Sequence, residues 1–136
     1  MTRRTRWVMP IVIVIAAAAM SWWSAKTAGA VELHVRNEVI ELIPLIRNNP
    51  EIVDKMVVNP ILSEPVSKTL SEMSSGWSGD KKDLLVTVTT GDDPNYGDGT
   101  ATHVAIVDVG NRNPVGLRIL CDGKNAPMFI MGVWTP

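Results

Sequence analysis

The residues best suited to chemistry in this sequence are the polar side chains of the stretch Gly91–Thr100, GDDPNYGDGT. Calcium sites take several oxygen ligands at alternating loop positions, with a glycine at the sharp turn. Asp93, Asn95 and Asp98 form the candidate calcium loop, but the spacing slips after Asn95 and no glutamate follows before the next predicted strand. Glycine, asparagine and aspartate are also the usual residues of tight turns. We therefore predict a turn between strands here, with calcium binding as the alternative.

Other patterns that carry enzymatic chemistry are missing from the sequence. It contains no G-x-S-x-G, no phosphate-binding glycine loop, no C-x-x-C and no H-E-x-x-H. The single cysteine, Cys121, rules out an intrachain disulfide and is predicted to be a small buried apolar residue. The two histidines, His34 and His103, do not cluster, and each is predicted at the surface or at its rim. We predict no enzymatic activity, no metal centre and no cofactor.

Charge and length limit the classes of partner. The chain has 136 residues, with 13 basic residues against 14 acidic ones and a net charge of -1. Once the apolar N-terminal stretch is set aside, roughly a hundred residues remain, which is enough for one small domain. No basic stripe runs along the sequence, so nucleic acid is not an expected partner.

The N-terminal stretch predicts a membrane anchor. Residues 7–25 carry no charge, and a bilayer core needs roughly 20 such residues. Tryptophans flank this stretch where interfacial aromatics anchor a spanning helix: Trp7, Trp22 and Trp23. Arginines precede it and place residues 1–6 in the cytoplasm and the rest of the chain outside it: Arg3, Arg4 and Arg6. We predict a single-pass protein of the bacterial inner membrane whose partners include the lipid bilayer.

A cleaved signal peptide is the alternative for the same stretch. Ala28, Gly29 and Ala30 match the small-x-small pattern of a cleavage site, with cleavage after Ala30. Paired tryptophans at the exit of the apolar stretch are more typical of an anchor. Both interpretations export the remainder of the chain to the periplasm.

The predicted exported domain is α+β, and its first part, residues 26–78, is helical. Apolar residues at helical spacing predict a first helix, which Pro44 should kink or shorten. Asn49-Pro50-Glu51 predicts the start of a short second helix, and Ser63-Glu64-Pro65 the start of a third that ends at Ser75-Gly76. The apolar stripe of the first helix comprises Leu33, Val39, Ile40, Leu42, Ile43 and Ile46.

The second part, residues 79–136, changes to an alternation of period two and predicts a sheet. Short turns such as GNRNP force neighbouring strands to be antiparallel. One face of the resulting four-stranded antiparallel sheet should pack on the helices. The predicted strands are Leu84–Thr90, His103–Val109, Val115–Cys121 and Met128–Trp134.

The order of these elements resembles the membrane-anchored assembly factors of cytochrome oxidase and the receptor-like subunit of the mitochondrial presequence translocase. Asn49–Val53 followed by Asn59-Pro60-Ile61 is similar to the N-P-x-V and P-I segment of those proteins. Gly97–Ala101, followed by the GNRNPVG hairpin, is similar to their G-x-G-x-A signature. The resemblance implies an α+β domain that docks on a membrane complex and has no cofactor of its own.

The function expected from these features is that of an accessory or assembly subunit of a larger membrane complex in respiratory or photosynthetic electron transport. Its partners would be the other subunits of that complex, contacted by protein-protein interaction. The apolar C-terminal strand offers the candidate contacts Met128, Phe129, Met131 and Trp134. Two alternatives stay open, namely an extracytoplasmic calcium- or ligand-binding domain and an envelope scaffold of the secretion or pilus kind.

Overall fold

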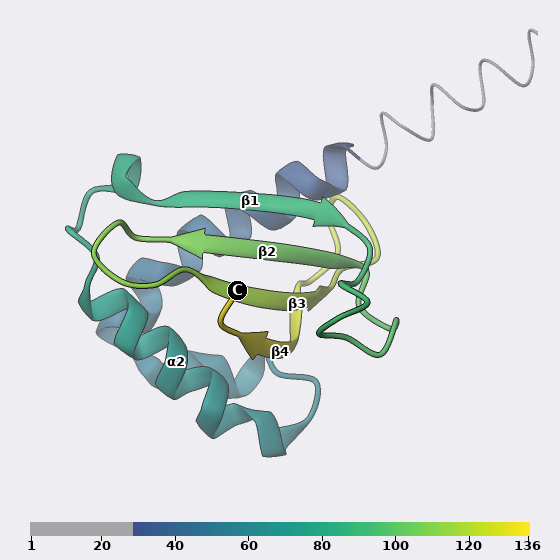
Figure 1. The fold of residues 1–136 in the computed structure, drawn as a ribbon, viewed down its shortest axis with the longest axis horizontal. Helices are drawn as coiled ribbons and strands as arrows, with labels where there is room; N and C mark the ends of the chain where they lie inside the picture. Colours follow the sequence, from purple (N-terminus) through teal and green to yellow (C-terminus); the bar gives the residue numbers. More distant parts are fainter. Residues whose placement is uncertain (1–28) are drawn as a thin grey trace, which may run out of the picture. The chain divides into compact units, whose positions relative to one another are not determined.

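The fold is α+β, with helical segments followed by one antiparallel sheet, as predicted. The computed structural model describes residues 29–136, of which 31–136 form one compact unit. Figure 1 shows the strands in front of the helix of residues 29–48. Within the described part of the chain, no helix is both long enough and apolar enough to cross a membrane. The predicted anchor, with Arg3, Arg4, Arg6, Trp7, Trp22 and Trp23, lies outside the described residues.

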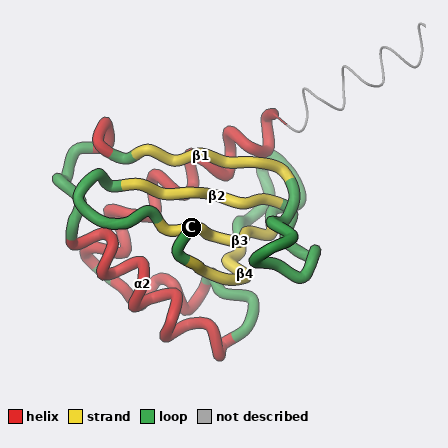
Figure 2. The backbone as a smooth tube through the Cα atoms, viewed as in Figure 1, coloured by secondary structure: helices red, strands yellow, loops and turns green. Residues whose placement is uncertain are grey.

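The four predicted strands are all present, with ends that differ by at most one residue. Each strand pairs antiparallel with the next, and the order in the sheet is β1-β2-β3-β4 (Figure 2). This meander follows from the short connections after β2 and β3, which leave no room for a crossover. The strands are β1 (Leu85–Thr90), β2 (His103–Asp108), β3 (Val115–Leu120) and β4 (Phe129–Trp134).

The core lies between the sheet and the helices. The inward residues of the strands, among them Ala105, Leu117 and Ile130, are fully buried. From the helical side, Ile43 of the 29–48 helix and Leu70 of α2 (Ser63–Ser75) join the same cluster. One sheet face and the apolar stripes of two helices therefore form a single core.

The first helix differs from its prediction in two respects. Leu33 was expected in the buried stripe but is 54% exposed, because at 3.6 residues per turn it lies opposite the core-facing residues Val35 and Val39. Pro44 does not shorten the helix, which continues to residue 48. Proline removes one intrahelical hydrogen bond, whereas Ile43 and Ile46 on either side of it are fully buried and hold the helix on the core.

The predicted second helix is a 3-10 helix, η1 (Pro50–Lys55). Its start is as predicted, since the side chain of Asn49 accepts a hydrogen bond from the backbone N–H of Glu51. Asn59 caps the next short 3-10 helix, η2 (Pro60–Leu62), in the same way, with the N–H of Ile61 as donor. Proline at the first position of each segment fixes a backbone angle that suits the start of a helical turn.

The outer edge of β4 is covered by the segment that links η1 to η2. The N–H of Ile130 donates to the carbonyl of Met56 at 2.7 Å, and the N–H of Val58 donates to the carbonyl of Ile130 at 3.1 Å. Val57 and Ile130 thus form a parallel bridge. The register between β3 and β4 shifts beside this bridge, with Met131 as the extra residue. A bridge and a bulge are both devices that protect a sheet edge.

His103 is buried, which corrects the predicted surface position. Only 4% of the residue is exposed, because as the first residue of β2 it points into the core. Its Nδ1 lies 2.9 Å from Oγ1 of Thr102, whose one hydroxyl proton lies between the carbonyls of Ile119 and Cys121. We therefore assign the ring proton to Nδ1. The bare Nε2 has no hydrogen-bond partner among the described residues.

Stability should consequently fall in mild acid. Burial lowers the pKa of His103 from its ordinary value of 6.5, and the nearby charge of Glu32 opposes this only in part. The unfolded chain therefore takes up the proton first, so stability is full above about pH 6.5 and declines as the pH falls toward the folded-state pKa. Urea denaturation of the full chain in mild detergent at about pH 7 and about pH 5 measures this difference. His103→Leu should reduce it and His34→Gln should retain it; an unchanged difference in His103→Leu would contradict the assignment.

Candidate functional site

The loop between β1 and β2 folds back onto the outer face of the sheet, meaning the face turned away from the helical core. It is held there by Arg118, which points outward from β3 and has 14% of its side chain exposed. The guanidinium binds the carboxylate of Asp92 at two points, with Nε–Oδ1 at 3.0 Å and Nη2–Oδ2 at 2.8 Å. Nη2 also lies 2.5 Å from Oδ1 of Asp98. One cation thus pairs with two carboxylates of the acidic loop.

This arrangement keeps both carboxylates ionised. The hydrogen bonds from the Arg118 side chain lower the pKa of Asp92, and partial burial opposes this, while the N–H of Gly99 adds a further bond in the same direction as Arg118. The hydroxyl and N–H of Thr100, followed by Arg118, lower the pKa of Asp98 to about 2. The two acids in turn raise the pKa of Arg118. The cluster is therefore a fixed ion-pair network at every physiological pH.

One side-chain oxygen of each aspartate in the candidate calcium loop takes part in hydrogen bonds of the folded loop. Oδ1 of Asp93 accepts the N–H of Asn95 at 2.9 Å, and Oδ1 of Asp98 accepts from Thr100 and from Arg118. The guanidinium of Arg118 already binds Asp98, so its positive charge would repel a calcium ion bound to the same carboxylate. In residues 29–136, no group of three or more His, Cys, Asp or Glu side chains is arranged to hold a metal ion.

Arg118 is the residue of this cluster that sequence reasoning missed. It is the single Lys or Arg within the four predicted strands. A cation in the middle of an apolar strand needs a counter-ion when it is largely buried. The nearby loop, with three aspartates between Gly91 and Thr100, had no cation of its own. Together, these two facts could have predicted that Arg118 pairs with an aspartate of this loop.

Trp134 anchors the same loop through an aromatic contact. Its ring stacks on Tyr96, with centroids 5.5 Å apart and planes 15° from parallel. Opposite Trp134 in the sheet stands Gly116, where an added Cβ would overlap the indole ring. Glycine at this position lets the indole lie flat on the outer face. The loop is thus fixed by an ion-pair cluster and by a stack.

The four candidate contact residues of the C-terminal strand divide between the two sheet faces. Met128 is buried, with 5% exposed, and belongs to the core. Phe129 is 36% exposed, and its partner Leu120 on β3 is outward-facing as well. Met131 and Trp134 are half-buried, Met131 at the bulge and Trp134 under Tyr96.

The outer face is more apolar than a solvent-facing sheet requires. Antiparallel sheets with one wet face usually alternate apolar and polar residues. The outward residues of β2 and β3 include the apolar Val104, Ile106 and Leu120 beside the charged Asp108 and Arg118. Leu85 at the start of β1 extends this surface and is 62% exposed. We name the accessible apolar residues of this face the outer-face surface: Leu85, Ile106, Leu120, Phe129 and Trp134.

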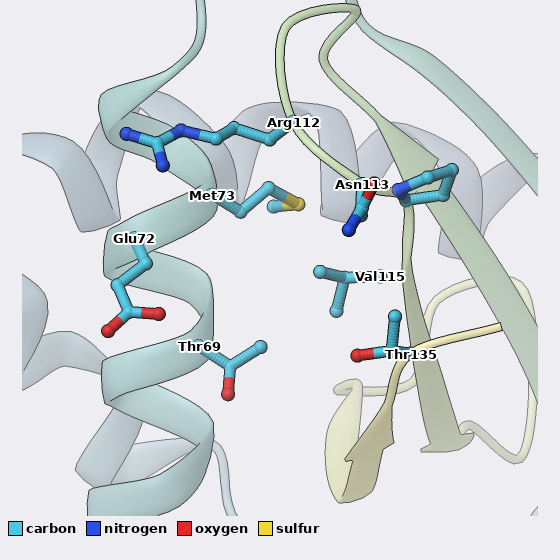
Figure 3. Close-up of a pocket in the computed structure, with 8 residues that line it drawn as sticks. Thr69, Glu72, Met73, Arg112, Asn113, Val115 and Thr135 are labelled. Atoms are coloured by element: carbon cyan, nitrogen blue, oxygen red, sulfur yellow. The ribbon is translucent and has the colours of Figure 1, made fainter.

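A separate cleft of about 200 Å³ lies between α2 and the start of β3 (Figure 3). Met73 from α2 and Asn113 from the β2–β3 turn point toward each other across it. The turn is fastened to the helix end, because the side-chain amide of Asn111 donates to the carbonyl of Gly76 at 3.2 Å. The lining is mixed and carries no nucleophile-base pair: Thr69, Glu72, Met73, Arg112, Asn113, Pro114, Val115 and Thr135.

Comparison with protein-family models, with curated proteins and with solved structures found no match to this chain.

Proposed function

We propose that this chain is a single-pass, membrane-anchored accessory or assembly subunit of a larger membrane complex of respiratory or photosynthetic electron transport. Its folded unit acts outside the cytoplasm by docking another subunit on the outer-face surface. The anchor rests on the uncharged stretch 7–25 that follows three arginines. The resemblance in element order to membrane-anchored assembly factors supports the same role.

The observation that carries the proposal is the group of apolar side chains that β2, β3 and β4 turn away from the helices. One face is accounted for by the helices, whereas on the other face Ile106 lies beside Trp134 and Leu120 beside Phe129, with no helix of residues 29–136 over them. A sheet that is apolar on both sides is normally covered on both sides. Apolar patches on an otherwise polar domain mark contact surfaces, so a partner subunit is the expected cover.

A charge on the outer-face surface should therefore release the chain from its complex. Phe129→Lys places a cation among apolar contacts, and the co-migrating amount should fall at least about tenfold, as for loss of an interface anchor. Gentle detergent extraction of the native membrane, size separation and mass spectrometry measure it. Ile61→Lys is the matched control, because Ile61 is 81% exposed but lies on η2 and not on the sheet. A wild-type chain that migrates alone would overturn the proposal.

A further inference from the structure

The two edges of the sheet differ in whether another segment of the chain protects them. The edge at β4 is closed by the bridge between Val57 and Ile130 and is interrupted by the bulge at Met131. The edge at β1 has neither feature, and its pairing with β2 is regular over all six residues. The strand reads LVTVTT, without the lysine, proline or bulge that commonly protects an edge.

The backbone groups that β1 turns outward can be identified from its pairing. The N–H of Gly91 donates to the carbonyl of Thr102 at 2.7 Å, which continues the ladder toward β2. Backbone groups of successive residues alternate in direction along an antiparallel strand. The N–H and C=O groups of Leu85, Thr87 and Thr89 therefore point toward β2. Those of Val86, Val88 and Thr90 point away from the sheet. In agreement, Nε of Arg36 reaches the carbonyl of Val86 from outside at 3.2 Å. Among residues 29–136, that side chain supplies the one hydrogen bond to this backbone edge.

The geometry points to β1 as the acceptor of a fifth strand, an extended segment of the partner subunit that pairs with Val86, Val88 and Thr90. This assignment deepens the proposed function and rests on it. Strand addition to an open edge obtains affinity from main-chain hydrogen bonds and specificity from side chains on alternate positions. The surroundings of the edge define which side chains would fit.

The 29–48 helix lies beside the edge on the core side and reaches it with Arg36 at Val86 and with Glu32, whose carboxylate accepts from the hydroxyl of Thr90. Two apolar residues lie along the same helix. Arg36 of the 29–48 helix touches Val86, and one turn away on either side along that helix stand Leu33, which is 54% exposed, and Ile40, which is half-buried. A strand added to β1 would set its core-facing side chains over Leu33 and Ile40. Leu33, which is not part of the buried stripe of its helix, would then be covered by the added strand. The added segment should therefore be apolar at alternate positions.

An acidic hollow lies at the C-terminal end of β1. It has a volume of about 320 Å³ and is lined by Thr89, Thr90, Asp92, Asp93 and their neighbours. Asp92 is neutralised by Arg118, whereas Asp93 has no salt-bridge partner among the described residues. A lysine or arginine on the added strand would complement Asp93. The partner segment is thus an extended, alternating apolar stretch with one basic residue.

A second copy of this chain matches the same edge less well, because its own β1, LVTVTT, carries no lysine or arginine to meet Asp93. The edge is therefore assigned to a different polypeptide.

The test uses the full chain in its native membrane and two substitutions at one position. Val88→Pro removes an outward N–H and fills the edge with a ring, while the ladder to β2 does not need that N–H. Val88→Thr keeps the N–H and nearly the same shape. The amount of chain that co-migrates with the complex should fall about tenfold for the proline variant, from the lost ladder bonds, and stay at the wild-type level for the threonine variant.

Photo-crosslinking and hydrogen exchange make the test independent of whether Val88→Pro folds. A benzoylphenylalanine at Leu85 should form adducts with the partner subunit, whereas one at Ile61 should not. The N–H groups of Val86, Val88 and Thr90 should gain exchange protection in the complex. Wild-type co-migration with no protection of these groups, or a folded Val88→Pro that co-migrates fully, overturns the edge assignment and leaves the proposed function standing. Adducts between two copies of this chain overturn it as well, whereas a wild-type chain that never co-migrates removes the proposed function itself.

Discussion

Arg118→Met is expected to lower the free energy of unfolding by about 3 kcal/mol, as for a buried ion pair that loses one partner. The substitution keeps the apolar stem of the side chain but leaves Asp92 without its cation. Only 4% of the Asp92 side chain is exposed. Because the carboxylate lies just beneath the surface, the loss should fall at the lower end of the range for buried pairs. Urea denaturation of the full chain in mild detergent measures it.

Two controls separate the ion pair from other effects of Arg118→Met. Asp98→Asn removes the other carboxylate, whose side chain is 66% exposed, and should have a much smaller effect because solvent screens this contact. Adding Asp92→Asn to Arg118→Met removes the unpaired charge and should recover part of the lost stability. A double variant no more stable than Arg118→Met would contradict the ion-pair explanation.

The same pair predicts how stability responds to acid. The pKa of Asp92 is lowered from its ordinary value of 3.8, chiefly by the hydrogen bonds from Arg118. A lowered carboxyl pKa contributes stability that is present above the ordinary value and is lost as the pH falls below it. Arg118→Met should therefore lose less stability than the wild type between about pH 5 and the acid limit of the folded state.

The sheet was predictable from the sequence because its signals are local. Period-two alternation and short polar turns fix the strands and their antiparallel neighbours, and the four strand ends follow within one residue. The cap at Asn49 and the helix end at Ser75-Gly76 were predictable for the same reason. The N-terminal anchor stays a prediction.

The features that sequence reasoning missed depend on contacts between distant residues. The Arg118–Asp92 pair joins residues 26 positions apart. The bridge from residues 56–58 to Ile130 uses backbone groups, which no side-chain pattern reports. His103 is buried because the first residue of β2 happens to face the core, and that depends on the register. The open edge at β1 is visible only once the strand order is known.

Ile130→Ala is the second substitution with a large expected effect, a loss of about 3 to 4 kcal/mol in the free energy of unfolding, as for a large-to-small change at a fully buried site. The side chain of Ile130 is fully buried, and its backbone carries the bridge to Met56 and Val58. The cavity therefore opens between the sheet and the segment that covers its edge. Neither element can close the cavity alone, because the hydrogen bonds at 2.7 and 3.1 Å hold them at a fixed separation.

The neighbouring residue supplies the control, since Phe129 points to the outer face and is 36% exposed. Phe129→Ala should change the free energy of unfolding by no more than about 1 kcal/mol, although it removes a larger side chain. Equal losses for the two alanine variants would show that β4 is not oriented as described. The same orientation explains why deleting Met128–Pro136 should unfold the chain: β4 supplies both Ile130 to the core and the partner strand of β3. Docking on the outer face must therefore be tested by outward substitutions in an intact strand, because a truncated chain would leave the complex by unfolding whether or not β4 touches a partner.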